Sequence, residues 1–373
     1  MFLAHLATPF APIQADSCLT GQCSTTQLTP PPASPPEGRC RCSPHIKAES
    51  TGTITGKRRE DGILVNGERV TVRYVLHAGD VLTLADRDTP ETATERVIPV
   101  ELPLDILYED DYLIALSKPA GMPTHPSHGH LCDTLANALA YRYLTANEPF
   151  VFRPLGRLDR NTSGVVVSAK TRAASGLLFH AMQKGLVRKR YLAIVEGTMP
   201  VDGEEHILRA LIYQPDGTGI RRAVAEEGHP DAADAVTRYR VLAAAGGLSL
   251  VLCEPVTGRT HQLRVHLAHM GYPILGDEIY GTPSSLIGRH ALHAISLSVP
   301  LPFATDLRKT SPQPSVDGRS VTVNSPSPDG YLHTLAPLPS DMAAPVDEHF
   351  PIWSQDTSRL PCALWGFGAT SAP

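Results

Sequence analysis

Hydrophobic and polar residues alternate in short runs over residues 61–84, which read DGILVNGERVTVRYVLHAGDVLTL. Alternation with a period of two is typical of strands that bury one face. Between two of these runs, Asn66-Gly67 is a strong signal for a two-residue hairpin turn, because both residues tolerate positive φ. The pattern predicts a small β-rich module over residues 56–88.

Apolar runs of strand length recur from Leu102 onward. The predicted strands cover residues 106–108, 112–116, 164–169, 191–195, 235–242 and 248–254.

Three segments carry apolar residues at helical spacing instead. The first helix is expected after Asp133, which would cap it, the second between Thr171 and Gly185, and the third between Thr260 and Gly271. On the first helix the apolar face consists of Leu135, Ala138, Leu139 and Tyr143. Because helices are interspersed among the strands without strict alternation, the pattern favours an α+β fold with a mixed or antiparallel sheet over a doubly wound parallel one.

Both ends of the chain lack such patterns. Residues 1–55 include the proline-rich stretch TQLTPPPASPPEGRCRCSP, which has too little apolar surface to pack, and are expected to be disordered. The tail, residues 343–373, places two tryptophans among prolines, and disorder is favoured over a docking segment there. The N-terminus lacks a Lys/Arg start and is interrupted by prolines, which argues against a secretory signal.

Composition narrows the setting of the protein. The chain has 373 residues and a formal net charge of −5, which by itself does not indicate a nucleic-acid binder. Basic residues nevertheless cluster at 153–160, 188–190 and 221–222, and each cluster is either a phosphate-binding face or solvated surface. No apolar run is long enough for a membrane helix. The odd number of cysteines, 7, argues against a disulfide scaffold and favours the cytoplasm.

Metal and cofactor sites are not expected. Four residues that could bind zinc lie close together at His125, His128, His130 and Cys132. The cysteines at 18, 23, 40 and 42 do not form two Cys-x-x-Cys knuckles, so no metal is predicted. No phosphate-binding glycine loop of a nucleotide cofactor site is present in the sequence either.

The segment Gly156-Arg-Leu-Asp-Arg-Asn-Thr-Ser-Gly164 places Asp159 between two arginines, at a turn that leads into a buried strand. An Asp in a turn more often serves local hydrogen bonding. Here the strand would hold the carboxylate rigidly and the arginines could keep it ionised, so Asp159 is a candidate catalytic group.

Two further segments carry candidate site residues. Residues 256–266 read VTGRTHQLRVH, and Arg259, just before a helix, suits a fixed pairing with a carboxylate, although a basic helix surface is the simpler alternative. In the strand 187–197, Tyr191 is either a core residue or a platform for an unpaired base.

Together these segments resemble the RluA-type RNA pseudouridine synthases, whose pattern joins Gly/His-Arg-Leu-Asp-x-x-Thr-Ser-Gly to Lys-x-Tyr-x-Ala and Gly-Arg-Thr-His-Gln-Ile/Leu-Arg-x-His. The segments ILYEDDYLIALSKPAGMPTHP (106–126), GYPILGDEIYG (271–281), ALHA (291–294) and YLHTLAPLPSDM (331–342) extend the match. The resemblance implies a catalytic domain over residues 102–342 whose mixed or antiparallel sheet is flanked by helices. It also implies that residues 56–88 are part of a small αL-type RNA-binding-like module.

The resemblance also implies residue roles. Asp159 matches the catalytic aspartate, Arg259 the arginine that pairs with it, and Tyr191 the tyrosine that packs against the target base. Substrate contacts are expected from Arg157, near the position that the flipped base vacates, and from Leu292, in the apolar floor of the pocket. Three other motif residues are expected to bind the substrate RNA: Thr162, His261 and Arg264.

The implied reaction is the isomerisation of uridine in structured RNA, ribosomal or transfer RNA, by a monomer that needs no cofactor. Breaking the bond between ribose and base develops positive charge on the sugar, which one carboxylate can trap covalently or relieve by removing a sugar proton. The target base must first leave its stack.

Two departures from the family pattern stand out. Gly156 occupies a position where many members carry His, so local RNA contacts are expected to differ there. Residues 45–60 lack the apolar helical stripe of the αL module, which puts RNA binding by that module in doubt. Two other functions stay open: an RNA-binding homologue without activity, and a glycoside hydrolase, which would need a second carboxylate about 5–10 Å from Asp159.

Overall fold

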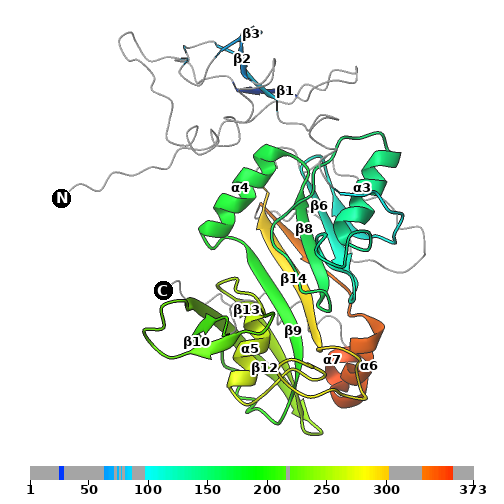
Figure 1. Ribbon diagram of the computed structural model, residues 1–373, viewed down its shortest axis with the longest axis vertical. Coiled ribbons are helices and arrows are strands. Elements are labelled where there is room, and N and C mark those ends of the chain that lie inside the picture. Colours follow the sequence, from blue (N-terminus) through cyan, green and yellow to red (C-terminus); the bar gives the residue numbers. More distant parts are fainter. Residues whose placement is uncertain are drawn as a thin grey trace, which may run out of the picture.

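The structure is a computed structural model, and it describes residues 25–28, 63–70, 74, 77, 80–85, 97–215, 219–301 and 330–355. Its strands form a small sheet near the N-terminus and a large sheet with helices beside it (Figure 1). None of the helices in this part of the chain has the length and apolar character needed to cross a membrane.

The small sheet contains β1 (Thr25–Leu28), β2 (Ile63–Val65), β3 (Glu68–Arg69) and β4 (Leu82–Ala85), in the order β1-β4-β2-β3. Asn66 and Gly67 connect β2 to β3 with φ values of 53° and 82°, the two positive angles of a type I′ turn. The predicted hairpin is therefore confirmed.

The strand β1 lies in the segment that was expected to be disordered. It pairs antiparallel with β4, which supplies a hydrogen-bonding edge that the pattern of residues 25–28 does not reveal. The expectation is wrong for these four residues. The other residues of the 1–55 segment, and the helical half of the expected αL module, lie outside the described residues.

The large sheet has 11 strands, and its central path runs β11-β10-β12-β13-β9-β14-β8-β6-β5. Its strands are β5 (Asp105–Glu109), β6 (Leu113–Lys118), β7 (Arg153–Pro154), β8 (Ser163–Ala169), β9 (Arg188–Glu196), β10 (His206–Tyr213), β11 (Ala223–Ala225), β12 (Ala233–Ala245), β13 (Leu248–Pro255), β14 (Leu292–Pro300) and β15 (Tyr331–Leu335). β14 and β8 are parallel, whereas the other described pairs are antiparallel. The predicted α+β fold with a mixed sheet is confirmed.

The parallel pair brings β8 against β14 at a position that requires glycine. Gly164 has a φ of +114°, and a Cβ atom there would collide with the carbonyl of Ala294 in β14. Only a residue without a side chain lets the two backbones approach so closely. This contact fixes the start of β8, directly after the turn that carries Asp159.

The three predicted helices are present as α3 (Leu135–Thr145), α4 (Arg172–Gln183) and α5 (Gln262–His269). Thr171 caps α4 as predicted, and Gly185 follows it with a φ of +68°. The cap of α3 is Thr134 rather than Asp133. Thr134 and Asn137 form a reciprocal capping box, whereas the carboxylate of Asp133 pairs with His130 at 2.6 Å.

The C-terminal segment contains two helices that the sequence did not predict. α6 (Ser340–His349) and α7 (Pro351–Gln355) lie together at one end of the large sheet (Figure 1). Met342, Val346 and Phe350 pack into the core formed by β9, β13 and β14, which stabilises α6 despite the proline inside it. Disorder is thus the wrong expectation for residues 343–355, and residues 356–373 lie outside the described part.

Three histidines are buried inside the large domain: His266, His290 and His293. Burial lowers the pKa of each to about 4. Hydroxyl groups contact their ring nitrogens: Thr237 at 3.0 Å from His266, Thr162 at 2.8 Å from His290 and Ser163 at 2.9 Å from His293. The fold therefore requires these rings to be neutral.

We predict that acid destabilises the fold through these rings. In the unfolded chain they take up protons near pH 6.5, but in the folded chain only near 4, so the unfolded state holds more protons between these values. The free energy of unfolding should fall as the pH drops through this window, by about 4 kcal/mol per pH unit at most for three histidines. Urea unfolding at a series of pH values measures the slope. His293→Asn should remove about a third of it, and an unchanged slope in that variant would contradict this assignment.

Candidate active site

Asp159 lies in the turn between β7 and β8. The backbone N–H of Thr162 donates to the carbonyl of Asp159 at 3.0 Å, which closes the turn. The Asp159 side chain remains 31% exposed, so its carboxylate is accessible from solvent. The rigid strand β8, buried along its whole length, begins at Ser163 and holds the turn in place.

The carboxylate of Asp159 is paired with Arg264 of α5. The Nη1 of Arg264 lies 3.4 Å from Oδ2 of Asp159. On its other side Arg264 forms two hydrogen bonds of 2.7 Å to Asp277, whose side chain is fully buried. Burial alone would raise the pKa of Asp277, but the hydrogen bonds and charge of Arg264 outweigh it and lower that pKa. One guanidinium therefore bridges a buried, ionised carboxylate and a half-exposed one.

This geometry corrects the expected pairing. Arg259 does not contact Asp159; its Nε donates to the backbone carbonyl of Asp234 at 3.0 Å. Arg264, expected to bind RNA, is 5% exposed and occupied by two carboxylates. The reason is the start of α5: the two arginines are five positions apart, and only Arg264 lies inside the helix, where it contacts Asp159.

His261 approaches the same oxygen atom. Its Nε2 lies 3.7 Å from Oδ2 of Asp159, and its side chain is 12% exposed. Its Nδ1 lies 2.8 Å from the hydroxyl of Tyr280. Arg264 and His261 therefore both face Oδ2 of Asp159. Among the described residues, no donor forms a hydrogen bond with its Oδ1.

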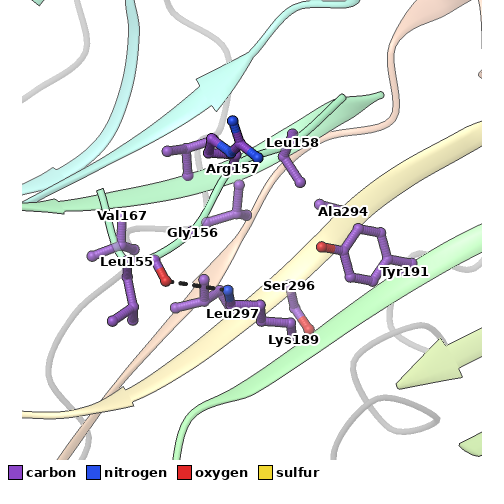
Figure 2. A pocket seen from close by; sticks show the side chains of 12 residues that line it. Leu155, Gly156, Arg157, Leu158, Val167, Lys189, Tyr191, Ala294, Ser296 and Leu297 are labelled. Atoms are coloured by element: carbon purple, nitrogen blue, oxygen red, sulfur yellow. Dashed lines mark hydrogen bonds between the residues drawn. The ribbon is translucent and has the colours of Figure 1, made fainter. Parts of the chain in front are cut away.

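Tyr191 and Lys189 project from β9 toward the Asp159 turn and line a pocket (Figure 2). The rest of the lining is mainly apolar: Leu155, Gly156, Arg157, Leu158, Val165, Val166, Val167, Ala294, Ser296 and Leu297. Burial, with a contribution from the charge of Asp159, raises the pKa of Tyr191, so its phenol is protonated at neutral pH. The 156–158 and 187–197 segments thus meet in this pocket, and the 256–266 segment joins them through the contact of Arg264 with Asp159, which does not itself line the pocket.

Gly156 and Lys189 occupy the same part of this pocket. A Cβ atom at position 156 would collide with the Nζ of Lys189, which lies 3.4 Å from the carbonyl of Leu155 (Figure 2). A side chain such as His at position 156 would therefore displace the lysine. Glycine at position 156, where many family members carry histidine, thus leaves room for the side chain of Lys189.

Several known proteins are similar to this chain. The family model described as RNA pseudouridylate synthase matches residues 112–269. The RNA pseudouridine synthase YjbO of Bacillus subtilis, itself uncharacterised, is 37% identical over 251 residues, which cover 67% of this chain and 86% of the relative. This chain belongs to the RNA pseudouridine synthases. The ribosomal large subunit pseudouridine synthase D of Xylella fastidiosa is 32% identical, covering 79% of this chain and 86% of that protein. A solved human structure, RNA pseudouridylate synthase domain containing 4, matches with 24% identity and a TM-score of 0.46, over 65% of this chain and 91% of that one.

As a member of this family, the protein is an isomerase that acts on RNA. Two residues that were expected to contact the substrate, Thr162 and Leu292, are buried in this pseudouridine synthase. Thr162 is 2% exposed, and its hydroxyl contacts His290, so it supports the turn from within. Leu292 belongs to the buried core against which Tyr191 packs, whereas Ala294 and Leu297 of the same strand line the pocket.

Lys118 is a residue near the Asp159 turn that the sequence did not single out. It is fully buried at the end of β6, and its Nζ donates to the carbonyls of Pro119, Met122 and Arg160 at 2.8, 2.7 and 3.0 Å. Burial and the nearby charge of Arg289 lower the pKa of Lys118 to about 7. The lysine thus ties the residue after Asp159 to the loop after β6.

Arg289 holds the other side of the turn. Its Nη1 donates to the carbonyl of Asn161 at 3.0 Å, and its Nη2 donates to the hydroxyl of Ser163 at 3.3 Å. Its Nε and Nη2 bind Asp341 of α6 at 2.7 and 3.0 Å. The Asp159 turn is therefore anchored both to β6 and, through one arginine, to the C-terminal helix.

The basic clusters of the sequence separate into different environments. Arg157 and Arg160 are exposed on either side of Asp159, as an RNA-contacting pair requires. Arg190 is 3% exposed and lies 3.2 Å from Glu254, so it belongs to the interior of the sheet. The cluster at 188–190 is therefore not a continuous phosphate-binding surface.

We predict that Arg264 and Arg259 differ sharply in importance. Arg264→Lys keeps the charge but cannot bridge two carboxylates, so turnover should fall on the order of 100-fold. The free energy of unfolding should fall by about 3 kcal/mol, because lysine cannot reproduce the paired hydrogen bonds to the buried Asp277. Arg259→Lys, the matched control, should stay within about threefold of the wild type. Comparable losses in both variants would contradict the corrected pairing; thermal melting and single-turnover kinetics measure both effects.

We also predict that Lys118 is needed for stability. Lys118→Met fills the same space but leaves three carbonyl groups without their donor, which should cost about 3 kcal/mol or more of unfolding free energy. Denaturant titration measures the loss. Lys184→Met, which changes an exposed lysine after α4, serves as the control. Equal stabilities of the two variants would show that the buried lysine does not hold the turn.

Proposed function

We propose that Asp159 is the catalytic carboxylate that acts on the ribose of a target uridine. The observation that carries this is the one-sided restraint of its side chain: Arg264 and His261 face Oδ2, and Oδ1 is left for the substrate. A carboxylate held in one orientation loses little entropy when it reacts.

The reaction rearranges bonds within the target nucleotide. The bond between ribose C1′ and base N1 breaks, and the electron pair stays with the base. After the base turns, C5 bonds to C1′, C5 loses its proton, and N1 gains one, so no co-reactant is consumed. Asp159 would act either by forming an ester with C1′ or by removing a proton from the sugar.

Tyr191 is proposed to support the base during this turn. Its ring lines the apolar pocket together with Leu158, the residue before Asp159, and burial raises the pKa of its phenol further above neutral pH. It can therefore stack on a base and donate a hydrogen bond, but it is poorly suited to accept a proton at neutral pH.

The target uridine is proposed to reach this pocket by flipping out of its stack. Arg157 is proposed to enter the space that the base vacates, because it is exposed and lines the pocket. Because the relative from Xylella fastidiosa is named for the ribosomal large subunit, ribosomal RNA is the first substrate class to test.

A glycoside hydrolase is less well supported. Asp277 lies across one guanidinium from Asp159, but it is fully buried and both of its oxygens are bound by Arg264. An ionised, enclosed carboxylate cannot protonate a leaving group or activate water. Asp277 therefore cannot serve as the second carboxylate that hydrolysis requires.

We predict that Asp159→Asn abolishes isomerisation and leaves RNA affinity within about threefold of the wild type, because the amide keeps the shape of the side chain but cannot act as a nucleophile or base. Tritium release from C5-labelled uridine in ribosomal RNA measures turnover, and filter binding measures affinity. Asp231→Asn, an exposed position, is the control. Turnover of Asp159→Asn within about tenfold of the wild type would overturn the proposed role.

We further predict that RNA binding weakens with salt despite the net charge of −5. Replacing both Arg157 and Arg160 by alanine should reduce the slope of log K against log salt by about 2, roughly one unit for each phosphate group that the variant no longer neutralises. Lys184→Ala should leave the slope unchanged. If the double variant has the slope of the wild type, these arginines do not contact phosphates.

A further inference from the structure

His261 adopts an unusual backbone conformation at the start of α5. It has a φ of 58° and a ψ of 17°, in the left-handed region that non-glycine residues rarely occupy. Its side chain does not cap the helix. Such conformations persist where the surroundings require them, often at functional sites. The bend directs the imidazole toward Asp159 instead of toward the first turn of α5.

Tyr280 controls the other side of the imidazole. Its hydroxyl oxygen accepts a hydrogen bond of 2.9 Å from the backbone N–H of Arg222 and lies 2.8 Å from Nδ1 of His261. The tyrosine itself is fixed: its backbone N–H donates to Asp277, and its ring lies 5.1 Å from the guanidinium carbon of Arg264. The hydroxyl is therefore held in place, and its own proton is free to point at His261.

These contacts favour one tautomer of His261. If Nδ1 accepts the phenol proton, Nε2 carries hydrogen and points a positive N–H at Oδ2 of Asp159, 3.7 Å away. In the other tautomer, the lone pair of Nε2 would face an ionised carboxylate, and the phenol would need a different acceptor. Burial lowers the pKa of His261, so a neutral ring is expected at neutral pH. A separation of 3.7 Å is long for a hydrogen bond, but such contacts commonly shorten when substrate binds.

We propose that Tyr280 fixes His261 as the Nε2–H tautomer, and that this neutral N–H and Arg264 together orient the Asp159 carboxylate for attack on the ribose. His261 and Tyr280 are thus positioning residues that act through Asp159, and the RNA contact first expected of His261 is not its main role. The proposal rests on the proposed catalytic function of Asp159.

The first experiment removes one hydroxyl group. Tyr280→Phe keeps the ring, its packing and its contact with Arg264, but it also removes the acceptor of the Arg222 N–H, so thermal melting accompanies the assay to show that the fold is retained. We expect the single-turnover rate to fall about tenfold while RNA affinity is unchanged, since the variant lacks about one hydrogen bond that orients the carboxylate. Nitrogen NMR of the His261 ring in the full-length protein should show loss of the Nε2–H tautomer. Tyr141→Phe, which removes an exposed hydroxyl that contacts Glu101, is the control. An unchanged rate, or an unchanged tautomer, in Tyr280→Phe would overturn the proposal.

The second experiment separates the N–H donor from the backbone conformation. Glutamine places an amide N–H near the position of Nε2, whereas asparagine tolerates positive φ better but reaches only to the position of Nδ1. We expect His261→Asn to be the more stable variant and His261→Gln to be the more active one. If His261 only supported the backbone, His261→Asn would be both the more stable and the more active variant, and that result would overturn the proposal.

Asp159→Asn, measured in the same assay, tells the two proposals apart. If it retains activity, the proposed function of Asp159 fails, and this inference fails with it. If Asp159→Asn is inactive while Tyr280→Phe is fully active, Asp159 keeps its role and only the tautomer proposal is overturned.

Discussion

One guanidinium organises the surroundings of Asp159. Arg264 binds the buried Asp277 through two short hydrogen bonds and reaches Asp159 with its remaining nitrogen. Burying an arginine is costly unless its donors are satisfied, and Asp277 meets that requirement without help from the substrate. The third contact can therefore be longer and weaker, which leaves Asp159 accessible and restrained by a group that is itself fixed.

Hydroxyl and imidazole groups form hydrogen bonds with one another and with Arg289 around this ion pair. Arg289 donates to Ser163, whose own hydroxyl can then donate to Nδ1 of His293, while Nε2 of His293 faces the carbonyl of Ala336. The contact between Thr162 and His290 lies next to it. Neutral rings of this kind link charged groups to the backbone without adding further charge to the interior. The network explains why the turn around Asp159 can be rigid although its own residues are polar.

The sequence predicted the sheet and three helices because those features follow from local patterns that the structure keeps, whereas the meeting of distant motifs was implied only by the resemblance to the family. It predicted the wrong arginine as the partner of Asp159, since Arg259 and Arg264 belong to one motif and only Arg264 lies within α5. Lys118 was missed because a lysine is normally exposed, and only its tertiary carbonyl partners reveal its burial. The helix α6 was missed because Pro345 argues against a helix, while its stability comes from packing on distant strands.

The bond between Arg289 and Asp341 has a consequence for the order of events during synthesis. Asp341 is separated from the Asp159 turn by about half of the chain, and contacts of such long range form late. Until β15 and α6 have been synthesised, Arg289 lacks its carboxylate partner and the carbonyl of Asn161 lacks a fixed donor. A nascent chain that stops short of Asp341 would accordingly contain Asp159, Tyr191 and Arg264 and yet lack one anchor of the Asp159 turn.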